Sequence, residues 1–316
     1  MIKTDKELKV PNWSKEHINR WADYIEFCCL YMDDHFISQD DVLDLFCDED
    51  PEELKRGETE HSAKYDSLIA VIKNYYEIIQ YRNCVHREYY PFEIEDGQSI
   101  SLKKTLTEKH LHYIFLLLCS NICFMDKTSM QKITHAFEKY CQPLMKRLVP
   151  ADARTELFGT TRDVSIFGGN LRSRIEQLAA CLGAQTTKTM DADPKYDRIK
   201  AGDAGLDIVS FLKLDEASHI PVALGQCTCS YDKWIEKQES INWDTWRARI
   251  DPLAPFWRFM YVPFFCRTAS GMFEQPSEIH TCLIDRQRIL ALLDSHKELF
   301  RETDSLKIKK IILEIW

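Results

Sequence analysis

The pattern of apolar and polar positions changes near the middle of the chain. In the first half, apolar residues recur every three to four positions in WADYIEFCCLYMDDHF and in AKYDSLIAVIKNYYEIIQYRN, the spacing of one helix face. The segment 91–101, PFEIEDGQSIS, is predicted to be a loop between helices. Residues 1–150 are therefore predicted to form an all-helical domain, to which we assign a regulatory or interaction role.

Beyond residue 150 the pattern is that of an α/β domain. Residues 149–170 are rich in Gly, Thr and Asp, as boundaries and loops are. The helix LRSRIEQLAACLGA, the strands GLDIVSFLKL and HIPVALGQCTC, a further helix, the strand FWRFMYVPFFC and a last helix then follow in order. This order predicts a mixed sheet flanked by helices over residues 151–316.

Composition and charge narrow the function. No apolar run reaches the ~20 residues that span a bilayer, and MIKTDKELKV lacks the apolar core of a signal peptide. We therefore expect a cytoplasmic protein without a membrane segment. Of the net charge of −9, residues 1–150 carry −7, with 19 Lys and Arg against 26 Asp and Glu. A non-specific polyanion binder is excluded, and any nucleic-acid contact is expected in the nearly neutral second half.

A carboxylate and an amide interrupt the two apolar strands of the second half. If the connecting turn is centred between Glu216 and Ala217, the numbers of two facing residues add up to 433. This register places Asp207 opposite Gln226. The same face then carries the apolar residues Val209, Phe211, Val222 and Leu224. An ionised Asp on such a face needs a partner. That partner is either a divalent cation, which the Gln226 side chain and the Cys227 carbonyl also reach, or hydrogen bonds within the protein.

This arrangement resembles the PD-(D/E)xK superfamily of restriction-endonuclease-like nucleases, in its Mrr-type QxK variant. The resemblance covers roughly residues 170–301, with Asp207 in GLDIV and the tripeptide Gln226-Cys227-Thr228 in GQCT. It implies a restriction-endonuclease-like core and a nuclease domain over residues 151–316. It also implies a Mg²⁺ or Mn²⁺ ion held by Asp207, Gln226 and Cys227, with Glu176 as an extra acidic ligand. The alternative for Glu176 is a solvated helix face.

The chain departs from this family at one position. Thr228 stands where the family has its catalytic lysine, which positions the attacking water and stabilises phosphate charge. Lys237, or else Lys233, on the next predicted helix is the candidate replacement, and the alternative for each is an exposed helix lysine. Lys213 shares the predicted face of Asp207 but lies at the far end of the hairpin.

The function implied by the resemblance is metal-dependent DNA endonuclease activity in bacterial restriction or anti-phage defence. The alternative is a catalytically degenerate nuclease fold that binds nucleic acid or a protein partner. A protein partner or a second copy is expected to bind through the helical first half. Four arginines interleaved with Trp243 and Trp246 are candidates for DNA contact, the alternative being an ordinary helix surface with tryptophans in the core: Arg172, Arg174, Arg247 and Arg249.

A cysteine-based site is a third interpretation. Cys227 and Cys229 form a closely spaced pair among the twelve cysteines and point to one face of a strand, so they could form half of a metal site. Either thiol could also act as a nucleophile with His219 or His280. Neither cysteine sits at a strand-to-helix turn with an evident oxyanion hole, which weighs against this interpretation.

Overall fold

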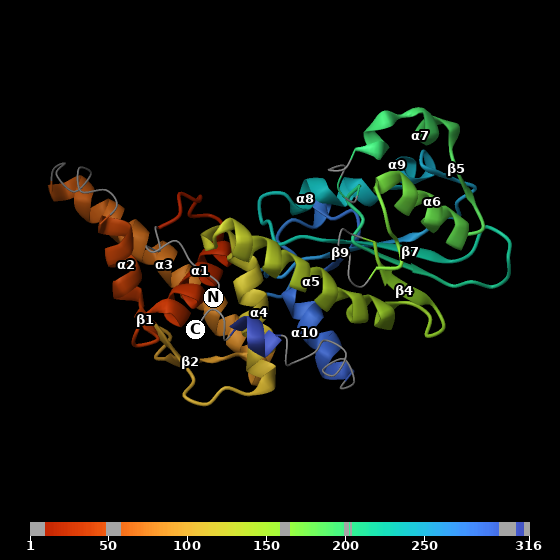
Figure 1. Ribbon diagram of the computed structural model, residues 1–316. Coiled ribbons are helices and arrows are strands. Elements are labelled where there is room, and N and C mark those ends of the chain that lie inside the picture. The colour runs from red at the N-terminus through yellow and green to blue at the C-terminus, as the bar shows by residue number, and fades with distance from the viewer. Residues whose placement is uncertain are drawn as a thin grey trace. The chain divides into compact units, whose positions relative to one another are not determined.

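The chain forms two compact units. The computed structural model describes residues 10–48, 58–158, 165–198, 202, 204–296 and 308–312 (Figure 1). The first unit combines Met1–Met130 with Pro263–Gln275 and Ser305–Trp316, and the second combines Gln131–Val262 with Pro276–Asp304.

The two units divide at a different point from the expected boundary at residue 150. The division falls within α5 (Lys127–Leu148), a helix that continues through Pro143. The change in residue pattern near position 149 therefore marks the end of this helix. The regulatory role assigned to residues 1–150 stays a prediction.

The first unit is mainly helical, but it also contains a small antiparallel sheet of order β1-β3-β2. The prediction of an all-helical part is therefore wrong for segment 91–101, which is a hairpin. Asp96 and Gly97 both have positive φ, at 48° and 69°, the conformation that closes tight hairpins. The elements are α1 (Ile18–Tyr31), β1 (Phe36–Ser38), α2 (Gln39–Asp48), α3 (Glu58–His86), η2 (Arg87–Tyr89), β2 (Phe92–Glu95), β3 (Ser99–Leu102), α4 (Glu108–Ser120) and η3 (Ile122–Phe124).

A buried ion-pair network holds the helices of the first unit together. The Arg82 guanidinium lies 2.7 Å from the Asp23 carboxylate and 3.1 Å from that of Glu26. The hydroxyls of Tyr90 and Tyr113 also donate to Glu26, at 3.0 Å and 2.9 Å. Because each buried charge has partners, the network is a structural element of the core.

The second unit is built on a five-stranded mixed sheet of order β10-β9-β7-β6-β4. Strand β6 is antiparallel to β4 and β7, whereas β7, β9 and β10 are parallel to one another. Besides α5, the elements are β4 (Arg154–Leu157), α6 (Leu171–Cys181), β5 (Gln185–Thr186), α7 (Lys188–Ala192), η4 (Pro194–Asp197), β6 (Ile208–Phe211), β7 (Val222–Cys227), α8 (Trp234–Lys237), η5 (Gln238–Ile241), α9 (Trp243–Arg247), β8 (Ile250–Asp251), β9 (Trp257–Tyr261), η6 (Pro276–Glu278), β10 (Cys282–Ile284) and α10 (Arg286–Ser295).

Helices cover both faces of this sheet (Figure 1). On one face, Val209 and Leu224 pack into the same buried cluster as Leu178 of α6. On the other face, a side chain at Gly225 would meet Met145 of α5, whose sulfur would lie 3.1 Å from the added Cβ. Burial on both sides explains the nearly continuous apolar sequence of β7. The prediction of a mixed sheet flanked by helices is confirmed.

Strand β4 was not predicted, because it lies in the segment 149–170 that reads as loop. Its residues pair with β6, with Thr155 opposite Ser210 and Leu157 opposite Ile208. The Thr155 hydroxyl donates to the Ser210 hydroxyl at 3.0 Å. Polar side chains at the edge of the sheet hide the alternation that usually reveals a strand.

None of the helices that the structure describes is long and apolar enough to cross a bilayer.

Candidate active site at the Asp207–Gln226 pair

The hairpin has the register that the sequence predicts. Val209 faces Leu224 and Phe211 faces Val222, so each pair sums to 433. On the same face, just beyond the pair of Ile208 and Gly225, lie Asp207 and Gln226, and the Gln226 Nε2 donates to Asp207 Oδ2 at 3.2 Å. The predicted cross-strand pairing is therefore confirmed.

Asp207 is buried, and both its carboxylate and its backbone are hydrogen-bonded. Its side chain is 3% exposed, and Oδ2 also accepts the backbone N–H of Cys227 at 2.6 Å. Its own N–H donates to the Gly225 carbonyl at 3.0 Å, and its carbonyl accepts the Phe158 N–H at 2.7 Å. These hydrogen bonds offset the cost of burying a carboxylate and fix the position of the group.

Both ends of the Gln226 amide are engaged. While Nε2 donates to Asp207, Oε1 accepts a short hydrogen bond from the hydroxyl of Ser240, on η5. The Ser240 Oγ also lies 3.0 Å from the Gly205 carbonyl oxygen and 2.7 Å from that of Lys237. Sequence reasoning missed Ser240, because no motif marks it and the loop at Gly205 brings it to the pair.

A lysine reaches the third position of the tripeptide. Thr228 is 1% exposed, and its Oγ1 accepts hydrogen bonds from Lys237 Nζ at 3.0 Å and from the Ser230 N–H at 3.2 Å. Lys237 ends α8 and is half-buried. The ammonium group of Lys237 therefore lies beside Thr228, the residue that follows β7.

The other two candidate lysines lie elsewhere. Lys233 is exposed at the start of α8. Lys213 pairs with Glu216 at 2.8 Å in the turn at the opposite end of the hairpin. Of the three lysines singled out from the sequence, the structure brings Lys237 to the site.

The site offers oxygen ligands for a divalent cation. The Asp207 carboxylate, the Gln226 amide oxygen and the Cys227 carbonyl are hard donors, and Mg²⁺ commonly binds through one carboxylate and keeps several waters. In the arrangement seen, however, Gln226 directs its NH₂ group toward Asp207. The residues therefore fit a cation held mainly by Asp207, with Gln226 joining after its amide turns.

Glu176 is not brought to this pair. It lies on the exposed face of α6 and interacts electrostatically with Arg172. Among the residues that the structure describes, no three His, Cys, Asp or Glu side chains form a group able to hold a metal ion. Any cation here would rely on Asp207, neutral oxygens and water.

Two of the four candidate DNA-binding arginines have structural partners. Arg172 pairs with Asp197 at 2.5 Å and also donates to the carbonyls of Met190 and Asp193, which ties α6 to the segment 188–197. Arg174 is buried and donates to the carbonyls of Phe158 and Gly202. Neither guanidinium is displayed for phosphate contact.

The other two arginines flank the tryptophans of α9. Arg247 is exposed. Arg249 is half-buried, with its guanidinium carbon 4.7 Å from the centre of the Trp246 ring. Trp246 is in the core, as the structural alternative predicts, whereas Trp243 is half-buried and packs on Phe256. Arg247 is thus the accessible candidate for a contact with DNA.

The surroundings of Cys227 and Cys229 do not favour a cysteine-based site. Burial raises the pKa of the Cys227 thiol well above its ordinary value, and Cys141 of α5 is its hydrogen-bond partner. A protonated buried thiol is a poor nucleophile and a poor metal ligand. His280 lies beside Glu239, at 3.2 Å, and His219 lies at the turn end of the hairpin. Cys229 is buried as well.

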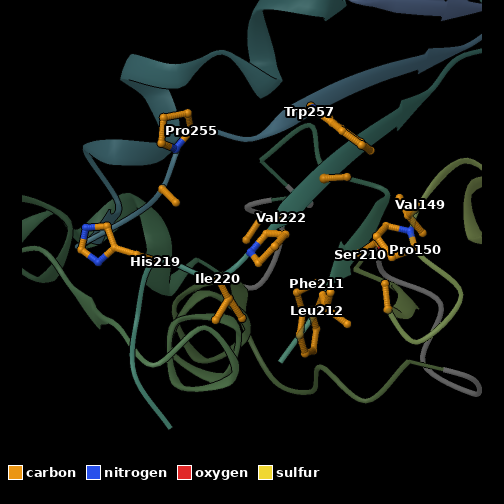
Figure 2. A pocket seen from close by; sticks show the side chains of 14 residues that line it. Val149, Pro150, Ser210, Phe211, Leu212, His219, Ile220, Val222, Pro255 and Trp257 are labelled. Carbon is orange, nitrogen blue, oxygen red and sulfur yellow. The ribbon is translucent and has the colours of Figure 1, made fainter. Parts of the chain in front are cut away.

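A cavity of about 340 Å³ lies at the turn end of the hairpin, away from Asp207 and Gln226. Figure 2 shows His219 and Pro255 on one side of it and Val149, Pro150 and Trp257 on the other. Its lining is predominantly apolar and, among the described residues, includes no Asp, Glu, Lys or Arg. This hollow is therefore separate from the chemistry of the pair.

None of the protein-family models, curated proteins or solved structures compared with this chain matches it. The class that the structure defines is that of a mixed α/β protein, with a five-stranded mixed sheet and a mainly helical first part. The restriction-endonuclease-like assignment stays a prediction, and the function is inferred from the site itself.

Proposed function

We propose that this chain is a metal-dependent DNA endonuclease that hydrolyses phosphodiester bonds. Its centre is formed by Asp207, Gln226, Thr228 and Lys237. The observation that carries the proposal is the 3.0 Å contact between Lys237 Nζ and Thr228 Oγ1. A lysine from α8 thereby supplies the positive charge that the QxK-like tripeptide lacks.

Each residue has a distinct role in this proposal. Asp207 provides the anionic ligand of a Mg²⁺ or Mn²⁺ ion, and its bonds to Cys227 and Gln226 hold the carboxylate in place. An ion held there would activate a water molecule and offset negative charge on the phosphate. Lys237, the most exposed member of the group, contacts the phosphate, and Thr228 aligns its ammonium group.

The biological setting is also a proposal, and it rests on the resemblance alone. It is an effector role in bacterial restriction or anti-phage defence, in the cytoplasm, with a partner or second copy bound by the helical first part. The net charge of −7 on residues 1–150 makes this part an unfavourable surface for DNA, since like charges repel. It is therefore better suited to protein contacts.

One observation favours the second candidate, a non-catalytic module that binds nucleic acid or a protein. The pair is satisfied without any ligand, because Asp207 Oδ2 accepts two hydrogen bonds and Gln226 uses both ends of its amide. Asp207, Gln226 and Thr228 are also all buried. A degenerate site would keep such a network for stability.

Cleavage of supercoiled plasmid DNA distinguishes the two candidates. The wild-type chain is expected to nick or linearise the plasmid with Mg²⁺ or Mn²⁺, and EDTA is expected to stop the reaction. Asp207→Asn, which keeps the shape of the side chain, is expected to lower the rate at least about 100-fold, because the metal loses its charged ligand. Asp244→Ala, at an exposed acid on α9, serves as the control.

Two outcomes would count against the nuclease. Cleavage that survives Asp207→Asn would place the activity elsewhere. Retarded migration of DNA without cleavage under any metal condition would favour the non-catalytic module. Circular dichroism of each variant confirms that the fold is retained.

A further inference from the structure

The hydroxyl of Ser240 faces more acceptors than it can serve. Its Oγ lies within hydrogen-bond distance of Gln226 Oε1, of the Gly205 carbonyl and of the Lys237 carbonyl. A serine hydroxyl has one proton to donate and two lone pairs to accept with. The pocket around Oγ is therefore rich in oxygen, and an N–H group directed at Ser240 would be favoured there.

The Gln226 amide can provide that N–H group by turning over. A rotation of about 180° about the last side-chain bond exchanges the positions of Nε2 and Oε1. The NH₂ group then donates to Ser240 Oγ, and the Ser240 proton goes to the Lys237 carbonyl, 2.7 Å away. In the observed orientation the single Ser240 proton can serve only one of the three oxygens around it, whereas the turned amide lets Ser240 accept from Nε2 and donate to Lys237, so Ser240 favours the turned amide.

The turned amide places an oxygen beside the Asp207 carboxylate. The amide atom now nearest to Asp207 Oδ2 lies 3.2 Å away. Two oxygens at this separation repel each other unless a cation lies between them. Two ligands bound at right angles to one Mg²⁺, each at ~2.1 Å, are about 3.0 Å apart. The observed spacing therefore suits a Mg²⁺-sized ion once the amide has turned.

We propose that Ser240 is a positioning residue that sets the orientation of the Gln226 amide, and that binding of a divalent cation at Asp207 turns this amide over. The inference rests on the proposed function, because it takes the same pair as the metal site. It adds a metal-dependent switch. Without the ion Gln226 donates to Asp207, and with the ion Gln226 presents its oxygen to the metal.

Titration of the full chain with Mn²⁺ by isothermal calorimetry tests this inference without any cleavage assay. Ser240→Ala is expected to raise the Kd for Mn²⁺ about tenfold, as is usual when a hydrogen bond that orients a metal ligand is lost. Ser240→Thr keeps the hydroxyl and is expected to stay within about threefold of wild type. Ser295→Ala, which removes a hydroxyl bonded to a backbone carbonyl of α10, is the matched control.

The same substitution in a Gln226→Glu background shows whether Ser240 orients the amide or only packs against it. In Gln226→Glu both terminal atoms are oxygens, so there is no orientation to select, and Ser240→Ala is expected to change the Mn²⁺ affinity of this variant by less than about threefold. An equal loss in the wild-type and Gln226→Glu backgrounds would show that Ser240 only packs, and would overturn the inference. The inference is also overturned if Ser240→Ala leaves the Mn²⁺ affinity of the otherwise wild-type chain unchanged.

The same titration distinguishes this inference from the proposed function. If Mn²⁺ binding is lost in Asp207→Asn but its affinity is unchanged in Ser240→Ala, the proposed turning of the amide is wrong and the proposed metal site is still supported. A wild-type chain that binds no Mn²⁺, or binds it equally well as Asp207→Asn, overturns both. Thermal melts by circular dichroism confirm that each variant is folded.

Discussion

At position 205 the backbone passes so close to Ser240 that only glycine fits. Gly205 has φ +74°, and an added Cβ would lie 2.3 Å from Ser240 Cβ and 3.0 Å from Gln226 Oε1. Gly202, three residues earlier, has nearly the same φ, +73°, but has nothing within 4 Å of its Cβ position. A side chain at Gly202 would therefore meet backbone strain alone, whereas a side chain at Gly205 would meet the same strain and also a steric clash.

This difference gives a prediction at the scale of single residues. Gly202→Ala is expected to cost about 1–2 kcal/mol in free energy of unfolding, from the left-handed backbone alone. Gly205→Ala is expected to cost at least about 2 kcal/mol more, because Ser240 must also move, as overpacking does elsewhere. Urea unfolding followed by tryptophan fluorescence measures both. Equal losses in free energy of unfolding for the two variants would mean that the loop at Gly205 can move away from Ser240 at no cost.

The pairing of Asp207 with Gln226 could be predicted because antiparallel register is arithmetic. Once the turn is centred, every facing pair is fixed, and the apolar face allows no slip by one residue. Lys237 could be proposed as a candidate but not chosen over Lys233, since their spacing of four residues places both on one helix face. The structural roles of Arg172 and Arg174 depend on loop carbonyls that no local pattern indicates.

At the scale of elements, α6 has two faces with different roles. Leu178 is fully buried in the cluster that covers the sheet, and Glu176 is exposed. Helical periodicity predicts this division, because positions 171, 175, 178 and 182 follow the three-to-four spacing. The helix therefore supports the hairpin through its apolar face, and its outer face carries Arg172, which bonds to the segment 188–197.

Two substitutions on α6 test this division. Leu178→Ala is expected to cost about 2–5 kcal/mol in free energy of unfolding, through lost burial and a residual cavity. Glu176→Ala is expected to change stability by less than about 0.5 kcal/mol and to leave the Mn²⁺ affinity unchanged. Urea unfolding and calorimetric titration of each variant give these values. Weaker Mn²⁺ binding in Glu176→Ala would restore Glu176 as a metal ligand.

The elements that the sequence failed to predict have a common cause. Strand β4 and the hairpin of β2 and β3 are short and carry Ser, Thr, Glu or Arg among their apolar residues. Their pairing, rather than their composition, makes them strands. Asp96-Gly97 was an available hairpin signal, since this dipeptide readily adopts two positive φ angles.

At the scale of the whole molecule, the chain returns to its first unit after completing most of the second. Residues Pro263–Gln275 belong to the first unit. There the Asn19 side chain donates to the Arg267 carbonyl at 2.7 Å and to Glu274 at 2.6 Å. Such contacts span about 250 residues, so local pattern cannot reveal them, and a boundary drawn from composition alone misses the returning segment.

The proposed role of Lys237, to supply the positive charge that Thr228 lacks, is tested by a pair of substitutions on α8. Rates of plasmid cleavage with Mg²⁺ are compared for the wild type, Lys237→Ala and Lys233→Ala, two lysines one turn apart on the same helix. A loss of at least about 100-fold is expected for Lys237→Ala, because charge stabilisation at the phosphate is removed. For the exposed Lys233, the change expected on substitution by Ala is within about twofold. Equal rates for the two variants would contradict the claim.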